Sequence, residues 1–194
     1  MRTQPISPVG EGEEQRALDT LVLAFTADPV IRWLYPQAWR YVTHFPEFLA
    51  AFGGKAFAAR TVWRLGEFSG VALWLPPQVE PDGDAIVAVI TASVAQEQHA
   101  DCMSVLGQMD AAHPRFPHWY LAWFGVDAAV QGRGFGGDLM QHCLSVVDED
   151  HLPAYLDSSN PRNISFYQRH GFEVTGEAQA GECPPVVSML RAAR

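Results

Sequence analysis

The spacing of apolar residues in the first half of the chain predicts helices separated by one β-hairpin. Leu18, Leu21, Val22 and Phe25 recur at intervals that place them on one helix face. The pair Asp28-Pro29 then closes this helix. The elements predicted up to residue 117 are a helix over 13–25, a second helix over 39–54 that breaks or kinks near Pro46, a hairpin of strands 61–65 and 71–75, and less regular helices over 84–99 and 101–113.

The second half alternates strands with helices. His118–Val126 is a continuous, aromatic-rich run, which is typical of a strand in the middle of a sheet. Asn160 as N-cap, Pro161 at the first position and Gly171 as C-cap indicate a helix between them. The other predicted elements are a helix with its apolar face at 139–147 and strands at 154–158, 172–178 and 184–191. This order predicts a mixed α/β sheet flanked by helices.

Composition and charge narrow the classes of function. The 194 residues are 48% hydrophobic and 18% charged, which fits one domain with a full core. A net charge of −9 repels phosphate backbones, so we expect no nucleic-acid partner, whereas a cationic small molecule or a basic peptide would be attracted. No stretch is apolar for long enough to span a membrane and the N-terminus lacks a signal-peptide pattern, so we expect no membrane partner.

Cysteine usage indicates a cellular compartment, and lysine usage indicates a type of source genome. Cys102, Cys143 and Cys183 are odd in number and form no CxxC pair, so we predict neither a disulfide framework nor a zinc site, and no other metal. We therefore expect a reducing cytoplasmic location. Lys55 is the only lysine among 13 basic residues, which is compatible with a G+C-rich bacterial genome.

The segment VQGRGFGGDLM, Val130 to Met140, lies between a predicted strand and a predicted helix. Free N–H groups and the macrodipole at a helix start attract phosphate when no side chain blocks the approach. The bare backbone comes from Gly132, Gly134, Gly136 and Gly137, and Arg133 adds a positive charge. The spacing matches neither a P-loop nor a first Rossmann turn, since Asp157 is no clear ribose-binding acid. A phosphate cradle and a simple tight turn both fit this segment.

A second motif gives the glycine segment a family context. Gln131, Gly134 and Gly136 form a QxxGxG pattern, and Asn160, Phe166-Tyr167 and Gly171-Phe172 follow it at a characteristic spacing. Together they resemble the GNAT superfamily of acyl-CoA-dependent N-acetyltransferases. The sequence over most of the chain is most similar to the puromycin N-acetyltransferase branch of this superfamily. The resemblance implies a GNAT-like twisted mixed sheet of about six to seven strands around a β-α-β-α acyl-CoA-binding core. It implies one domain over 1–194, with an acceptor side at 1–117, the core at 118–172 and final strands at 173–194.

The resemblance also implies a set of contacts to acetyl-CoA. Backbone groups of Phe124 and Val126 would pair with the pantetheine arm, although both residues also fit as core strand residues. The loop residues Gln131, Gly132, Arg133, Gly134, Phe135, Gly136 and Gly137 would bind the pyrophosphate through consecutive amides. Asn160 and Asn163 would face the cofactor, while an N-cap and a solvent-facing position are the plain structural interpretations of these two residues.

Tyr167 is the catalytic residue that the resemblance implies. Its hydroxyl would give a proton to the departing thiolate of CoA, and the alternative is a tyrosine whose ring only packs on the sheet. Some relatives carry a glutamate on the central strand where this chain has Ala122, so no direct carboxylate base is evident. His118 and Tyr120 are possible proton relays, and the amide of Val126 would hold the oxyanion.

The acceptor is expected to be a primary amine of a small molecule, bound by the N-terminal half and the last strands. Some of Trp33, Trp39, Trp63, Trp74, Phe45 and Phe48 would line its pocket, with most of them in the core. Acetylation of a protein or peptide and a non-catalytic acyl-CoA-binding module are the alternatives on the same fold. We expect a monomer or a homodimer.

Overall fold

The structure is a computed structural model that describes residues 4–194. Its centre is a seven-stranded sheet in the order β1-β2-β3-β4-β5-β7-β6, in which only β4 and β5 are parallel neighbours. The strands are β1 (Ile6–Pro8), β2 (Val62–Leu65), β3 (Gly70–Leu75), β4 (Trp119–Val126), β5 (Ala154–Ser158), β6 (Glu173–Ala178) and β7 (Val186–Arg191). The mixed seven-stranded sheet and the central position of β4 confirm the predicted fold class.

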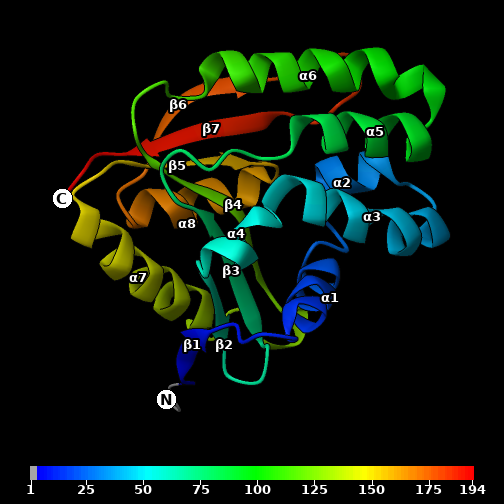
Figure 1. Ribbon diagram of the computed structural model, residues 1–194. Helices are drawn as coiled ribbons and strands as arrows, with labels where there is room; N and C mark the ends of the chain where they lie inside the picture. The colour runs from blue at the N-terminus through cyan, green and yellow to red at the C-terminus, as the bar shows by residue number, and fades with distance from the viewer. Residues whose placement is uncertain (1–3) are drawn as a thin grey trace.

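Helices cover both faces of the sheet, as Figure 1 shows. They are α1 (Glu14–Ala24), α2 (Pro29–Leu34), α3 (Ala38–Gly53), α4 (Lys55–Ala59), α5 (Gly83–Ser93), α6 (His99–Ala112), α7 (Phe135–Val147) and α8 (Ile164–Arg169). Helices α1 to α6 share one hydrophobic core with one face of the sheet, and α7 and α8 share a second core with the opposite face. The protein therefore has three layers, and β4 and β5 lie in the middle one.

Helix α7 shows how the sequence pattern produces this packing. Its predicted apolar face is fully inside the second core, where the buried residues are Leu139, Met140, Cys143, Leu144 and Val147. Full burial of one such aliphatic side chain stabilises the fold by about 1.5–3 kcal/mol relative to exposure. The helix begins directly after the glycine segment, so this packing also fixes the segment against the sheet.

Four elements differ from the prediction. Strand β1 and helices α2 and α4 were missed because all three are short, with three, six and five residues. Helix α3 runs through Pro46 without the break that was predicted as one alternative there. Its deeply buried residues Phe45 and Leu49 pack against the sheet, and this tertiary packing outweighs the backbone hydrogen bond that Pro46 cannot donate.

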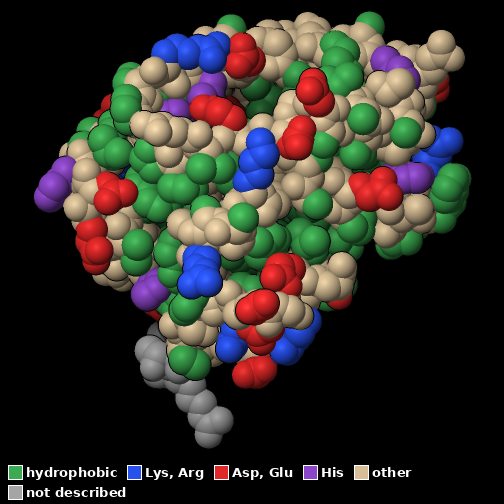
Figure 2. Space-filling model, in the orientation of Figure 1, with side chains coloured by type: hydrophobic (Ala, Val, Ile, Leu, Met, Phe, Trp, Pro, Cys, Tyr) green, Lys and Arg blue, Asp and Glu red, His purple; other side chains and the backbone are tan. Residues whose placement is uncertain are grey.

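Acidic and basic side chains are interspersed over the face of the molecule in Figure 2. Within residues 4–194, no helix is both long enough and apolar enough to cross a bilayer. The same residues contain no cluster of three or more His, Cys, Asp or Glu side chains suited to a metal ion. The three cysteines are buried as free thiols.

Candidate functional site

The site begins where β4 and β5 separate. Their parallel pairing is limited to Trp119–Leu121 against Ala154–Leu156, while β4 continues to Val126. On its other side, β4 pairs with β3 so that Leu73 faces Trp123 and Trp74 faces Leu121, which leaves Ala122 as the extra residue of a β-bulge. A bulge bends and twists its strand. We call the gap between the second half of β4 and β5 the wedge.

The hydrogen-bond pattern shows which main-chain groups face the wedge. Asp127 donates its N–H to the carbonyl oxygen of Ser69 at 2.9 Å, so this N–H is directed toward the β3 side of the chain. Because main-chain groups of successive strand residues point to opposite edges, Gly125 is also directed to β3, whereas Phe124 and Val126 direct their N–H and C=O groups to the wedge. This orientation is the one that strand-like pairing with an extended ligand requires.

One of these groups is already occupied. The side chain of Gln131 donates from Nε2 to the carbonyl oxygen of Val126 at 2.9 Å. Gln131 therefore ties the glycine segment to the end of β4 through its side chain, and its backbone N–H is left for a ligand. The free groups on this edge of β4 are both polar groups of Phe124 and the N–H of Val126.

The glycine loop, Gln131 to Gly137, presents bare main chain at the start of α7. Gly134 is the N-cap residue of this helix with φ of +88°, and Gly132 has φ of +74°, both in the left-handed region that favours glycine. A Cβ atom added at Gly132 or Gly137 would meet no protein atom within 4 Å. Among the described residues, no internal acceptor takes a backbone N–H of this loop. The loop thus fits a phosphate group, as predicted.

The glycine loop forms one wall of a cleft of about 650 Å³, which we call the glycine-loop cleft. Its other walls are the end of α1, the wedge side of β4 and the segment around α8. Arg162 and Arg169 line it and place positive charge opposite the loop, in a protein whose net charge is −9. Arg133 is exposed and its guanidinium donates to the carbonyl of Ala129 at 3.4 Å, so it lies at the loop surface.

Asn160 and Asn163 occupy the start of the segment that leads into α8. The side chain of Asn160 accepts a hydrogen bond from the N–H of Arg162 at 3.1 Å and so acts as the predicted N-cap, here of a 3₁₀ turn over Pro161–Asn163. Both asparagines also line the glycine-loop cleft. The structural and the cofactor-facing interpretations are therefore compatible for Asn160.

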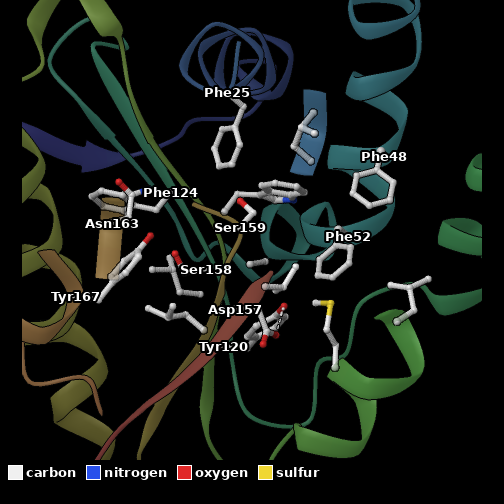
Figure 3. A pocket seen from close by; sticks show the side chains of 18 residues that line it. Phe25, Phe48, Phe52, Tyr120, Phe124, Asp157, Ser158, Ser159, Asn163 and Tyr167 are labelled. Carbon is white, nitrogen blue, oxygen red and sulfur yellow. Dashed lines mark hydrogen bonds between the residues drawn. The ribbon is translucent and has the colours of Figure 1, made fainter. Parts of the chain in front are cut away.

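Tyr167 lies on α8 with its ring in the second core and its hydroxyl at the cleft. It is 7% exposed, and its ring packs against Phe166 and Phe172. Figure 3 shows the hydroxyl directed toward the cavity. Burial, and secondarily the charge of Asp28, raises the pKa of Tyr167 above that of an ordinary phenol. The hydroxyl therefore stays protonated at neutral pH and is available as a proton donor.

A second cavity lies on the other side of Tyr167. This aromatic pocket has a volume of about 100 Å³ and is bounded by α1, α3, α6 and the splayed parts of β4 and β5. Phe25, Phe48 and Phe52 surround it in Figure 3, and the indole of Trp123 packs edge-on against all three. Four residues line both cavities and mark their junction: Phe25, Phe124, Asn163 and Tyr167.

The polar end of the aromatic pocket is Asp157 of β5. Its carboxylate accepts hydrogen bonds from the hydroxyls of Ser188 at 2.7 Å, Tyr155 at 2.9 Å and Tyr120 at 3.2 Å. Burial raises the pKa of Asp157, and the three hydroxyl groups oppose that shift. Sequence reasoning used Asp157 only to argue against a Rossmann turn, because nothing in one sequence shows that its side chain faces Tyr120 of the neighbouring strand.

The six aromatic residues predicted for an acceptor pocket are mostly elsewhere. Phe48 lines the aromatic pocket, whereas Phe45 and Trp74 are completely buried in the two cores. Trp63 belongs to the core on the α7 face, Trp33 is partly buried against the core on the opposite face, and Trp39 is 60% exposed. The aromatic lining that was missed comes from Phe25, Phe52, Tyr120 and Trp123.

Comparison with known proteins explains this arrangement. Residues 34–172 match the model of the acetyltransferase (GNAT) family. The chain belongs to the GNAT family. It is therefore an acetyltransferase, and acetyl transfer is the activity that this family membership supports. The finer resemblance to the puromycin N-acetyltransferase branch stays a prediction, since the family match does not separate the branches.

The relatives of this GNAT enzyme include proteins of several kinds. It is 26% identical over 178 residues to an uncharacterized N-acetyltransferase of Schizosaccharomyces pombe, covering 81% of this chain and 70% of the relative. A solved structure described as histone acetyltransferase HPA2 and related acetyltransferase, from Corynebacterium glutamicum, aligns with a TM-score of 0.69 at 23% identity, over 100% of this chain and 98% of the other. Arylalkylamine N-acetyltransferase 2 from Aedes aegypti aligns with a TM-score of 0.71 at 10% identity, over all of both chains. At these identities the two structures support the fold.

The GNAT fold implies acetyl-CoA as co-substrate, and the residues of this chain fit it. The open glycine loop and the two arginines suit a diphosphate, and the free main-chain groups of Phe124 and Val126 suit the amide-containing pantetheine arm. A ligand held in this way would carry its thioester to the junction at Tyr167. The predicted site residues are thus brought together around one cleft, except for Arg133, which does not line it.

Proposed function

We propose that this GNAT enzyme transfers an acetyl group from acetyl-CoA to the primary amine of a small molecule that binds in the aromatic pocket. The observation that supports this acceptor class is the pocket itself, which is aromatic on its sides and has a volume of about 100 Å³. An apolar cavity of roughly 150 Å³ binds benzene, so this smaller pocket, which opens to the glycine-loop cleft at their junction, suits a group no larger than one aromatic ring. A small arylalkylamine has that group and an amine.

Acetyl-CoA supplies the activated acyl group and a thiolate leaving group. The protein holds the diphosphate at the glycine loop and aligns the arm along Phe124 and Val126, so that both reactants meet at one place. Tyr167 Oη delivers a proton toward the sulfur, because an alkyl thiolate leaves more readily when it is protonated as the bond breaks. Direct attack requires donor and acceptor to be bound together, and the junction of the two cavities provides for that.

Two further expectations belong to this proposal. We propose that the whole chain works as one transferase domain, with residues 1–117 and 173–194 supplying most of the acceptor side, and the match over 34–172 supports the core of that division. We also propose a cytoplasmic enzyme, which three free buried thiols support.

An amine panel tests the acceptor class. Purified protein is incubated with acetyl-CoA and either small arylalkylamines, aliphatic diamines or lysine-containing peptides, and products are identified by mass spectrometry. The proposal predicts acetylated arylalkylamines and free CoA thiol. Acetylation of the peptides with no small-amine product would contradict the small-molecule acceptor while leaving the acetyltransferase activity in place.

A further inference from the structure

Asp157 is a carboxylate at the aromatic pocket to which the reaction described above assigns no role. Its carboxylate closes one end of the aromatic pocket, and no Lys or Arg side chain of the described residues lines this pocket or pairs with it. Charged carboxylates that are mostly enclosed by protein normally have a cationic partner. The missing partner is therefore expected to come from the ligand.

The hydrogen bonds of Asp157 leave room for such a ligand. A carboxylate has about four acceptor positions. Oδ1 accepts two hydroxyl protons, from Tyr155 and Ser188, whereas Oδ2 accepts one, from Tyr120 at 3.2 Å. Asp157 also keeps part of its surface open, because it faces the cavity and not the packed core (Figure 3). Oδ2 thus has capacity for one more donor.

The position of Asp157 in the sheet places it at the apex of the wedge. The last parallel pair of β4 and β5 is Leu121 with Leu156, so Ala122 and Asp157 are the first residues after the strands separate. An acyl donor aligned along β4 brings its reacting carbon toward this apex. The central strand offers no carboxylate at Ala122, and the neighbouring strand supplies one at almost the same level.

We propose that Asp157 binds the ammonium form of the acceptor and takes its proton, which makes it the general base of the acetyl transfer. This role rests on the proposed function above. The aromatic rings of the pocket add to the selection of a cation, since ring faces attract ammonium groups. The raised pKa of Asp157 suits a base that works near neutral pH.

The ammonium group of the acceptor loses two protons in this reaction. The ammonium nitrogen gives one proton to Asp157 Oδ2 and becomes a nucleophile with a free electron pair. As the new C–N bond forms and the C–S bond breaks, the sulfur takes a proton from Tyr167 Oη. The nitrogen then loses its second proton, and this proton restores the hydroxyl of Tyr167. Asp157 returns its proton to water when the products leave, so that one proton is released in each turnover of an alkylammonium substrate.

The charged surroundings of Asp157 are few. Beyond the tyrosine rings lie His113 and His118, whose Nε2 atoms are 3.0 Å apart, and Glu80, whose carboxylate is 3.9 Å from His113. Burial, and then its neighbour His118, lowers the pKa of His113, so that this imidazole is neutral near pH 7. Among the described residues, the only other acid that lines either cavity is Asp28, which belongs to the glycine-loop cleft and not to the aromatic pocket.

Asp28 has a structural task that Asp157 lacks. It accepts the N–H groups of Val30 and Ile31 at 3.1 Å each as the N-cap of α2, and it accepts the hydroxyl of Ser159 at 2.7 Å. Asn is an equally good N-cap, so Asp28→Asn preserves the helix start and removes the charge. This variant is a matched control for loss of a buried carboxylate close to the site.

The test compares two probes of the same shape. 2-Phenylethylamine is mostly protonated at pH 7, whereas O-benzylhydroxylamine, in which an oxygen replaces one methylene, is a neutral amine at that pH. We expect Asp157→Asn to lower kcat/KM for 2-phenylethylamine roughly 100-fold or more, and for O-benzylhydroxylamine less than about fivefold. Asp28 lines the cleft of the acyl donor, which both reactions share, so Asp28→Asn is expected to change the two values by the same factor and to leave their ratio unchanged.

The pH profile provides a second readout. Tyr155→Phe removes a hydrogen bond that stabilises the charged carboxylate, so the pKa of Asp157 rises further and the acid limb of kcat/KM moves to higher pH with its plateau retained. Equal losses of kcat/KM for both probes in Asp157→Asn, or no loss for either, would refute the role of Asp157 as general base. If wild-type protein binds CoA but acetylates neither probe nor any other small amine of the panel, the proposed function fails and the role of Asp157 fails with it.

Discussion

The substitution Tyr167→Phe, which removes the hydroxyl oxygen, tests whether Tyr167 is the general acid of the proposed reaction. In Tyr167→Phe the ring keeps its contacts with Phe166 and Phe172 in the second core. Among the described residues, no group pairs with the hydroxyl, which faces the junction of the two cavities. The free energy of unfolding should therefore change by less than about 0.5 kcal/mol. The loss should appear in the reaction alone.

The expected loss follows from the chemistry of the leaving group. A positioned general acid contributes typically a factor of 10² to 10⁴, so kcat should fall at least about 100-fold, equivalent to roughly 2.7 kcal/mol of barrier. The diphosphate and pantetheine contacts do not involve Tyr167, so the Kd for CoA should stay within about twofold. Because burial raises the pKa of Tyr167, the wild-type enzyme should keep its acid protonated beyond the pH range in which an exposed tyrosine ionises.

The assay follows release of CoA thiol with a chromogenic disulfide, with Kd from calorimetry and stability from thermal denaturation. Tyr41→Phe is the control, since that buried tyrosine donates its hydroxyl to the carbonyl of Val22 and lines neither cavity. It should lower stability by about 1 kcal/mol and leave kcat unchanged. A kcat of Tyr167→Phe within threefold of wild type, with the same Kd for CoA, would refute Tyr167 as the acid.

Three other changes have measurable outcomes. Gly134→Ala puts a Cβ on a residue with φ of +88°, so it should cost about 1–2 kcal/mol and raise the calorimetric Kd for CoA about tenfold, whereas Gly107→Ala, at an open helical position of α6 that lines neither cavity, should do neither. Arg169→Ala should raise the Kd for CoA about three- to tenfold at low salt, with a smaller effect in 0.5 M NaCl because salt screens the exposed charge. An unchanged Kd would show that Arg169 does not contribute to CoA binding. Asp148→Asn should destabilise the fold by about 2–4 kcal/mol at pH 7 in urea unfolding, because it leaves the buried Arg191 without its bidentate partner. Arg191 lowers the pKa of Asp148, so this stability is fully present above the carboxyl's unfolded pKa and is lost as pH falls through the lower folded value; a wild type and variant that lose stability in parallel between pH 5 and 2 would contradict it.

The sequence predicted the elements whose patterns are local. The apolar face of α7, the central strand and the N-cap at Asn160 each depend on residues a few positions apart, and the structure confirms all three. The glycine loop was also predictable, because bare backbone before a helix has a direct physical meaning. These features form the side of the site that would hold acetyl-CoA.

The acceptor side was not predictable in the same way. Asp157, Tyr120 and Ser188 come from three strands, and their contact depends on the register of β5 with both of its neighbours. Phe25 follows α1 and Phe52 lies on α3, and both rings pack against Trp123 of β4. A register shift of one residue would turn each strand side chain to the opposite face, so no spacing in one strand reveals the pocket.

The parting of β4 from β5 has a consequence for the free enzyme. The centre of a sheet is ordinarily its best protected region, yet here water must satisfy the polar groups on one edge of the middle strand whenever the donor is away. Amide hydrogens at Phe124 and Val126 should then exchange rapidly in the resting protein and slowly in its presence. The acyl donor would thus take the place of an additional strand beside β4, at the centre of the sheet.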